Sequence, residues 1–275
     1  KALESGADAV IFDLEDSVPI AMKAEARTAV AQAIDHAAGT ASHPAVFVRV
    51  NGPATGLLDD DINAIVRRGL DAVFVPKVEN VTEIRHVATL LDTLEAKCGM
   101  TAGSVEIIPM IESALGVLRC YDLAMAHPRV ATTCIGTARD GDLQTDLGCS
   151  WSIEGTELLY ARSKVLLDTR AAGKPYPLDG VFSDLADEAA LIADTRLSAR
   201  LGYVGRTVIH PKQIVPVRQA YAVPEAEVTY YREVVAQFEA VEKTGTAAIT
   251  VNGKLVDYAM YQRAKKVLEL AKLDA

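Results

Sequence analysis

The sequence predicts an α/β protein that folds as a TIM (β/α)8 barrel and continues into a C-terminal helical extension. Three observations lead to this fold class: apolar segments that end in polar residues, helical periodicity between them, and glycines where the helices are expected to end. Strands that alternate with helices indicate a parallel sheet, because each helix returns the chain to the edge where the next strand begins. With 275 residues and 50% hydrophobic content, the chain can bury the core of one barrel-sized domain.

Seven apolar segments are expected to be strands. In chain order they are Asp8–Val18, Ala45–Asn51, Ala72–Glu79, Val105–Ser113, Val130–Asp142, Asp179–Asp184 and Tyr203–His210. A closed barrel of this type needs eight strands. The sequence opens on what reads as a helix, Lys1–Ser5, that leads into the first segment. We therefore expect that the first strand of the barrel lies upstream of Lys1 and is missing from this sequence.

The segments between the strands have the spacing of amphipathic helices, as in residues 62–66 and 84–94. Gly6, Gly69 and Gly202 stand where such segments stop, which is the position that glycine favours at a helix end. Each of these glycines is followed by the next apolar run. The repeated order of helix, glycine and strand supports a barrel over residues 1–223.

The pattern changes near Pro224. Residues 224–275 are expected to form a helical extension or lid beyond the barrel. It should contain a helix at Glu225–Glu242, a short strand or loop at Ala247–Asp257, and a last helix at Tyr258–Lys272. These segments are not needed to close the barrel, so their apolar faces must cover another surface.

Composition argues against several classes of protein. Thirty-seven acidic and twenty-eight basic residues give a formal charge of −9 without any Lys/Arg run, so nucleic acid is not an expected partner. No apolar stretch reaches the length that spans a membrane, and no signal peptide is visible. The four cysteines are widely spaced and form no Cys-x-x-Cys pair, which argues against a zinc or redox site. We expect a cytoplasmic enzyme that acts on a small molecule.

The first predicted strand ends in three carboxylates, Asp13, Glu15 and Asp16. Alternation along a strand places Asp13 and Glu15 on one face and brings Asp16 to the exit loop. Carboxylates this close repel one another and are costly to bury, so a divalent metal or a cationic side chain is expected beside them. A strand end that simply runs into water is the alternative reading of this segment alone.

Polar residues at the other strand ends strengthen the first reading. In a parallel barrel all C-terminal strand ends open on one face, so these side chains should share one mouth. The expected group is Asp13, Glu15, Arg49, Lys77, Glu79, Glu112 and Asp142, with Asn51 on the same side of its strand as Arg49. We favour a metal and oxyanion site over a structural ion-pair network. Oxygen ligands without a His/Cys cluster indicate Mg²⁺ or Mn²⁺ rather than zinc.

These residues resemble the citrate lyase beta-subunit-like branch of the HpcH/HpaI aldolase family, among the phosphoenolpyruvate/pyruvate TIM barrels. The resemblance covers essentially the whole chain in order. The matching segments are Ser5–Val18, Val48–Asn51, Val75–Glu79, Ile111–Ser113, Asp142–Gly148, Gly202–Gln213 and Asn252–Asp257. Family members normally begin with a strand that bears a Phe-Val-Pro-Gly-like loop, which also implies a strand upstream of Lys1.

The resemblance implies a metal site in which Glu112 and Asp142 bind Mg²⁺ directly. Glu15 and Asp16 would lie close by and hold the waters of the ion. In this chain Asp140 competes for the second ligand role, because the segment reads Gly136-Thr-Ala-Arg-Asp-Gly-Asp142. We choose Asp142 because the following Leu-x-x-Asp-Leu-Gly register matches the family.

The resemblance also implies roles around the substrate. Arg49 would bind a substrate oxygen or carboxylate and act in catalysis, and Asp257 of a neighbouring subunit would close over the substrate as the acid/base residue. The other implied substrate-binding residues are Asn51, Lys77, Glu79, Arg206 and His210, the last two near a coenzyme A or acyl-carrier arm. Arg206 stands where the family usually has Lys, which keeps the charge but not the geometry. A shared site implies a homo-oligomer, a trimer or a dimer of trimers.

The implied activity is a Mg²⁺-dependent carbon–carbon lyase. It would cleave or form a 3-hydroxyacyl thioester such as malyl-, methylmalyl- or citramalyl-coenzyme A, giving an acyl-coenzyme A and a 2-oxo acid. Several alternatives stay open: a citrate lyase beta subunit that acts on an acyl carrier protein thioester, a thioesterase, a Schiff-base aldolase with Lys77 as nucleophile, and a noncatalytic subunit that binds an acyl carrier.

Overall fold

The computed structural model describes residues 1–242 and 248–273. Two structural units divide the chain, Lys1–Ala220 and Tyr221–Ala275. The boundary expected after residue 223 lies close to the observed one. Each unit has its own sheet and its own helices, so each is described by itself.

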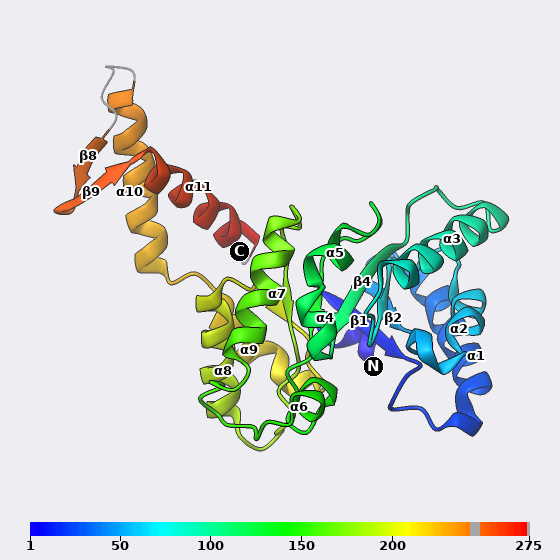
Figure 1. The fold of residues 1–275 in the computed structure, drawn as a ribbon. Coiled ribbons are helices and arrows are strands. Elements are labelled where there is room, and N and C mark those ends of the chain that lie inside the picture. The colour runs from blue at the N-terminus through cyan, green and yellow to red at the C-terminus, as the bar shows by residue number, and fades with distance from the viewer. Residues whose placement is uncertain (243–247, 274–275) are drawn as a thin grey trace. The chain divides into compact units, whose positions relative to one another are not determined.

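Over the described residues, seven parallel strands form one curled sheet in the first unit (Figure 1). They are β1 Ala9–Asp13, β2 Ala45–Arg49, β3 Ala72–Val75, β4 Glu106–Ile111, β5 Cys134–Ile135, β6 Leu178–Asp179 and β7 Gly205–Arg206. The strands pair in sequence order from β1 to β7, which is the order of a TIM barrel. The predicted fold class and all seven strands are confirmed, and the strand expected upstream of Lys1 stays a prediction.

Helices connect these strands as the sequence predicts. The first unit contains α1 Lys23–Ala38, α2 Leu58–Ile65, α3 Val81–Lys97, α4 Ala114–Leu118, α5 Cys120–Met125, α6 Asp142–Leu147, α7 Leu159–Ala171, α8 Glu188–Leu201 and α9 Ile214–Tyr221. Short 3-10 helices lie at Ala2–Glu4, Ile20–Met22, Pro53–Thr55 and Pro211–Gln213. The expected helix at Lys1–Ser5 is therefore only one 3-10 turn. Local signals place the longer helices: a capping box of Asn80 and Glu83 starts α3, and Gly202, with φ of 112°, ends α8.

Three predicted strands are much shorter than expected, and the one at Tyr203–His210 is reduced to Gly205–Arg206. The strand at Val130–Asp142 is reduced to two residues, and Asp142 is instead the first residue of α6. The strand at Asp179–Asp184 stops after its first residue. The close approach of two backbones explains where β5 and β6 end. A Cβ on Gly180 would lie 2.5 Å from the Ile135 carbonyl oxygen, so a residue with a side chain has no room there.

The core of the sheet is an apolar row that continues into the polar site. Ala72, Phe74, Ile108, Met110 and Cys134 form one buried cluster, with Phe47 and Leu178 packed against it. Along β2 the residue two positions after Phe47 is Arg49, and two positions after Met110 is Glu112. Because side chains alternate along a strand, Arg49 and Glu112 lie on the same face as this cluster.

The second unit is a helical pair with a β-hairpin. It contains α10 Glu225–Glu242, strands β8 Ala248–Val251 and β9 Lys254–Asp257, and α11 Tyr258–Leu273. The predicted helix at Glu225–Glu242 is confirmed, and the strand or loop expected from Ala247 is a hairpin from residue 248 onward, Ala247 lying outside the described residues. Asn252 and Gly253 both have positive φ, as a tight hairpin turn requires. Phe238, Val256 and Tyr261 belong to a separate buried cluster of this unit.

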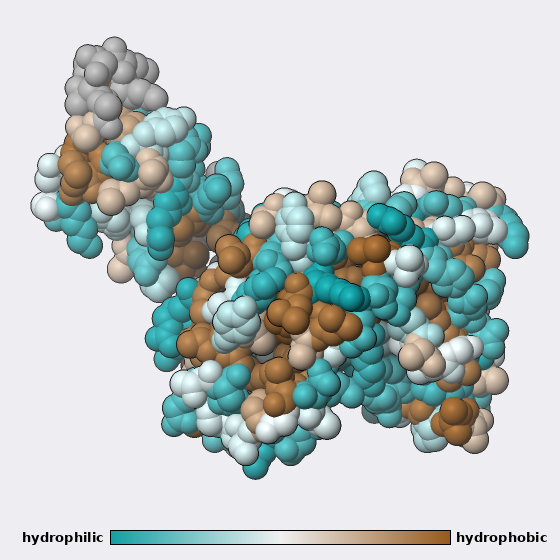
Figure 2. Space-filling model, in the orientation of Figure 1, coloured by the Kyte–Doolittle hydropathy of each residue, from teal (hydrophilic) through white to brown (hydrophobic). Residues whose placement is uncertain are grey.

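Exposed apolar side chains gather on part of the first unit. On the face seen in Figure 2 they lie over α4 and the neighbouring part of α7. The exposed large residues of α4, α5 and α7 are Leu115, Leu118, Tyr121, Met125, Leu159, Tyr160 and Leu167. Across the described ranges, no helix combines the length and the apolar character needed to cross a membrane.

Candidate functional site

A network of charged side chains stands at the C-terminal ends of β1 to β4. Asp13 and Arg49 are partners in the register of β1 and β2, and their side chains form a two-pronged ion pair at 2.7 and 2.6 Å. Arg49 also approaches Glu15, with Nη1 and Oε2 2.9 Å apart. The planar guanidinium thus bridges two carboxylates that would otherwise repel each other.

Lys77 brings two further carboxylates, Asp16 and Asp142, to Glu15. Its Nζ lies 3.0 Å from Glu15, 3.2 Å from Asp16 and 3.4 Å from Asp142. Its backbone φ is 56°, a left-handed conformation that is unfavourable for a residue with a side chain. Such strain is tolerated where the surroundings hold the residue, and here the carboxylates do so.

Glu112 is the most deeply perturbed acid of the group. It is buried, and its Oε2 has no hydrogen-bond partner among the described residues. Burial and the nearby charges of Glu15 and Asp142 raise its pKa to about 7, although Arg49 and Lys77 act in the opposite direction. Gly136 allows this placement, since a Cβ there would lie 2.8 Å from Glu112 Cγ. We call these groups the carboxylate cluster: Asp13, Glu15, Asp16, Glu112 and Asp142, with Arg49 and Lys77.

Burial and pairing compete in the rest of the cluster. Burial raises the pKa of Asp13, but the hydrogen bonds and charge of Arg49 outweigh it, so the pKa lies below its ordinary value. For Glu15 burial wins over the attraction of Arg49 and Lys77, and the pKa is raised. Burial lowers the pKa of Lys77, but the bonds to Glu15 and Asp16 outweigh burial. The pKa therefore lies above its ordinary value, and the amine stays protonated.

The geometry distinguishes Asp142 from Asp140. The Asp142 side chain is 47% exposed and its charge acts on Glu112 and Lys77. The Asp140 side chain is 82% exposed and forms an ionic contact with Arg139 at 3.8 Å. Asp142 therefore lies in the cluster and Asp140 outside it, and the choice of Asp142 as a second metal ligand stays a prediction.

Two of the expected mouth residues are engaged elsewhere. Asn51 is buried, and its side chain bonds to Leu14, Lys23 and Asp61 rather than to the cluster. The reason is that β2 ends at Arg49, so strand alternation no longer fixes where Asn51 points. Glu79 accepts a hydrogen bond at 2.6 Å from the hydroxyl of Ser113, the residue that follows Glu112 in the chain.

The two residues expected near a carrier arm have structural contacts. The Arg206 side chain has no exposed surface: it pairs with Asp194 at 2.8 Å and donates to Gly180 and Thr195. This arrangement argues against a direct contact of Arg206 with a ligand. His210 is exposed, and its Nδ1 accepts from the Lys212 backbone N–H, which caps a 3-10 helix.

Asp257 lies in the second unit, at the end of β9. Its Oδ1 accepts from the Met260 backbone N–H at 2.9 Å, so it caps the start of α11. The residue is exposed. An acid/base role in the site of a neighbouring subunit stays a prediction.

Sequence reasoning missed two buried charged residues, Lys23 and Asp61. Asp59, Asp60 and Asp61 stand in the first turn of α2, where acidic residues suit the helix dipole, but Asp61 is fully buried. A signal was present, because Asp61 lies three residues after Leu58 and four before Ile65, on the apolar face of α2. Lys23 likewise shares one helical stripe with Val30 and Ile34.

The chemistry of the cluster fits a hard divalent cation. Within residues 1–242 and 248–273, no group of three or more His, Cys, Asp or Glu could hold a metal ion by itself. Two carboxylates can nevertheless be enough for Mg²⁺, which keeps several waters and also binds substrate oxygens. The unpartnered Oε2 of Glu112 and the outward acid Asp142 are the two groups suited to this role.

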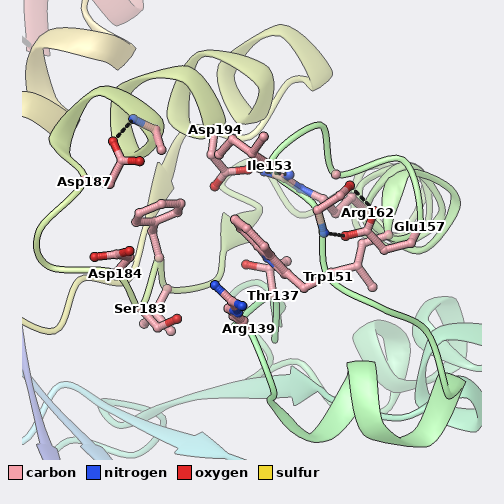
Figure 3. A pocket seen from close by; sticks show the side chains of 16 residues that line it. Thr137, Arg139, Trp151, Ile153, Glu157, Arg162, Ser183, Asp184, Asp187 and Asp194 are labelled. Carbon is pink, nitrogen blue, oxygen red and sulfur yellow. Dashed lines mark hydrogen bonds and ion pairs between the residues drawn. The ribbon is translucent and has the colours of Figure 1, made fainter.

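A separate cavity of about 210 Å³ lies between α7, α8 and the loops after β5 and β6. Figure 3 shows Trp151 in the middle of its lining, above Thr137 and Arg139. Trp151 packs edge-on against Phe182, with ring centroids 6.1 Å apart, and the Arg139 guanidinium lies 5.4 Å from the indole centre. None of the lining residues belongs to the carboxylate cluster.

Known proteins are similar to this chain over nearly its whole length. A family model described as HpcH/HpaI aldolase/citrate lyase matches residues 1–211, and one described as C-C bond lyase of the TIM-barrel fold matches residues 165–274. The citrate lyase subunit beta of Leuconostoc mesenteroides subsp. cremoris is 36% identical over 267 residues, 97% of this chain and 86% of that protein. The L-malyl-CoA/beta-methylmalyl-CoA lyase of Cereibacter sphaeroides is 30% identical, covering 99% of this chain and 90% of that protein.

A solved structure extends the comparison to ligands. The protein CitE from Mycobacterium tuberculosis, in complex with magnesium, acetoacetate and coenzyme A, has a TM-score of 0.74 to this chain at 27% identity. The similarity covers 97% of this chain and 90% of that chain.

Proposed function

The chain belongs to the HpcH/HpaI aldolase/citrate lyase family, and from that premise we propose that it uses Mg²⁺ to cleave or form a 3-hydroxyacyl thioester. As a member of this family it is a carbon–carbon lyase. The proposed substrates are malyl-, methylmalyl- or citramalyl-coenzyme A, and the products are an acyl-coenzyme A and a 2-oxo acid. Relatives named for malyl-coenzyme A and a structure that holds magnesium and coenzyme A support this choice.

The observation that carries the proposal is the state of Glu112. A buried carboxylate with a raised pKa and an oxygen left without a partner among the described residues is unfavourable unless it has a task. Glu112 and Asp142 would hold Mg²⁺, with Glu15 and Asp16 beside it. When bound, the ion would make the substrate hydroxyl more acidic and draw negative charge from the oxygens of the keto acid.

The cationic side chains would serve the charge that develops during cleavage. Asp13 and Glu15 hold Arg49 in one orientation, so its charge is available to an oxyanion without reorganisation. Lys77 stays protonated because of its carboxylate partners, and a protonated amine cannot attack a carbonyl. This favours substrate binding by Lys77 over the Schiff-base alternative.

Further parts of the proposal concern assembly and the lid. We propose a homo-oligomer, a trimer or a dimer of trimers, in which Asp257 of one subunit serves as the acid/base residue over the cluster of the next. Exposed apolar residues of the second unit, such as Leu255, Tyr258 and Met260, are suited to such an interface. A cytoplasmic location and the use of coenzyme A rather than a carrier protein belong to the same proposal.

A thioester screen tests the proposed function. Purified protein is incubated with malyl-, methylmalyl- and citramalyl-coenzyme A, each with Mg²⁺, Mn²⁺ or EDTA, and the release of a 2-oxo acid is measured. Mg²⁺-dependent release is expected. A free hydroxy acid instead would indicate a thioesterase, activity only on a carrier-protein thioester would indicate a citrate lyase beta subunit, and binding without turnover would indicate a noncatalytic subunit.

The first prediction concerns pH. Because the metal-free pKa of Glu112 lies near 7, its proton must leave before it can bind a cation, so Mg²⁺ affinity is expected to rise as pH increases through about 7. Calorimetric titration between pH 5.5 and 8.5 measures this dependence. The Glu112→Gln variant is the matched control and should show a flatter profile. A wild-type affinity that is constant over this range would contradict the prediction.

The second prediction concerns Arg49→Lys. The substitution keeps the charge, but an ammonium cannot bridge Asp13 and Glu15 in the way a planar fork does. We expect kcat to fall on the order of 100-fold, the usual cost of removing one oxyanion donor. Thermal unfolding should change little by comparison. Near-normal kinetics in a folded Arg49→Lys variant would remove Arg49 from the mechanism.

A further inference from the structure

Lys23, the first residue of α1, is buried with its ammonium group enclosed by neutral acceptors. Nζ donates to the Leu14 carbonyl at 2.6 Å, the Glu15 carbonyl at 2.8 Å and Asn51 Oδ1 at 2.7 Å. These bonds use all three protons of the ammonium. A charge held inside the protein without a direct carboxylate partner is costly, so simple packing does not explain it.

Asn51 connects this ammonium to a buried carboxylate. Its Nδ2 donates to the Leu14 carbonyl at 2.9 Å and to Asp61 Oδ2 at 2.6 Å, and its backbone N–H donates to the same Asp61 oxygen. The other oxygen of Asp61 accepts from Arg27 Nε at 2.7 Å. Lys23, Asn51, Asp61 and Arg27 therefore form a continuous polar chain, which we call the support chain.

The support chain ends on the backbone that carries Glu15. The Glu15 carbonyl accepts from Lys23, and its backbone N–H donates to Asp13 Oδ1 at 3.0 Å. The preceding carbonyl, that of Leu14, is held by both Lys23 and Asn51. With both sides of the peptide fixed, the Glu15 carboxylate is directed at Arg49 and Lys77.

We propose that Lys23, together with Asn51 and Asp61, is a positioning group that holds Glu15 in the carboxylate cluster and thereby sets the affinity of the cluster for Mg²⁺. Asn51 then acts through the backbone of β1 and its exit loop rather than on the substrate. The inference rests on the proposed function for its link to turnover. Its link to metal binding does not require any thioester to be a substrate.

The test compares Mg²⁺ binding by calorimetry in Lys23→Met and wild type. Removing a positive charge near the site should by itself tighten cation binding. Loss of positioning should weaken it by roughly 10-fold, the usual cost of removing a group that orients a metal site. The two explanations thus predict opposite signs. Turnover should fall through kcat, with the KM for the thioester little changed.

Coupling to Glu15 gives a second readout. If Lys23 acts through the Glu15 carboxylate, the double variant of Lys23→Met and Glu15→Gln should lose much less affinity than the product of the two single losses. Independent, multiplicative losses would overturn the proposal, as would unchanged or tighter Mg²⁺ binding in folded Lys23→Met.

A matched control is Arg129→Met. Arg129 is another buried cation, paired with Glu95 and Asp92, and its backbone carbonyl bonds to Ile107 near the start of β4, away from the carboxyl ends of the strands. The Arg129→Met substitution should reduce the melting temperature without changing Mg²⁺ affinity.

If Lys23→Met fails to fold, Lys23→Arg takes its place, because a guanidinium keeps the charge but cannot direct three protons from one nitrogen. Wild-type Mg²⁺ affinity in Lys23→Arg would then overturn the proposal. Mg²⁺ binding without any thioester cleavage in wild type would defeat the proposed function alone.

Discussion

Replacing Glu112 by glutamine is expected to remove most Mg²⁺ binding and most turnover while leaving the fold intact. The amide keeps the size of the side chain but not its negative charge, and the charge is what a hard cation requires. Because groups that merely orient a ligand cost about 10- to 100-fold in metal affinity, a direct ligand should cost at least on the order of 100-fold. Calorimetry measures the affinity and the thioester assay measures turnover.

The same substitution should stabilise the metal-free protein at high pH. The folded state holds the Glu112 proton more tightly than the unfolded chain, since burial raises the pKa from 4.5 to about 7. The stability linked to this proton is present below the unfolded pKa and is lost as pH rises through about 7. Glu112→Gln avoids that loss, so at pH 8 it should be more stable by up to about 3 kcal/mol. At pH 4 the difference should vanish.

Two neighbours provide the controls. Asp142→Asn is expected to weaken Mg²⁺ binding as well, whereas Asp140→Asn should leave it unchanged because Asp140 faces Arg139 and solvent. Full affinity in Glu112→Gln would defeat the metal assignment. Loss of binding in Asp140→Asn alone would mean that the register of the second ligand is wrong.

Much of the fold could be predicted because local signals agree with the global pattern. The family resemblance is confirmed by relatives that match the chain almost end to end. Helix α10 begins and ends where its periodicity predicts, and each predicted strand overlaps an observed one, β6 at Asp179 alone. The lengths of β5 and β6 could not be predicted, since they depend on the contact of Gly180 with the neighbouring strand, which no local signal encodes.

Most of the site could be predicted because its charged residues stand at or just after the ends of apolar segments. Arg49 and Glu112 follow the apolar interior row by strand alternation, and both reach the cluster. Asn51 lies beyond the end of β2, where alternation no longer applies, and it turns to Asp61. Lys77 reaches the cluster through a left-handed backbone that no sequence rule indicates. Lys77 was nevertheless expected in this group, whereas the direction of Asn51 depends on its long-range contact with Asp61, which single-sequence reasoning could not foresee.

The acid/base role of Asp257 is a prediction about two subunits, so its test must use two subunits. Asp257→Ala is expected to fold normally, because the change lies at an exposed position at the end of β9, and to lose most turnover while keeping Mg²⁺ affinity. That separation distinguishes it from Glu112→Gln, which loses both. Asp257→Asn is the matched control for the cap of α11, since asparagine also caps helices.

Mixing the two inactive variants should restore activity. In a hybrid oligomer, a site is active when an Asp257→Ala subunit supplies the intact Glu112 and a Glu112→Gln neighbour supplies the intact Asp257. Random assembly of equal amounts gives this combination in about a quarter of the sites, so about a quarter of wild-type activity is expected. If each subunit instead placed its own Asp257 over its own cluster, the hybrids would recover no activity. Verified hybrids that stay inactive, or a fully active monomer, would therefore rule out the shared site while leaving the metal site of Glu112 and Asp142 untouched.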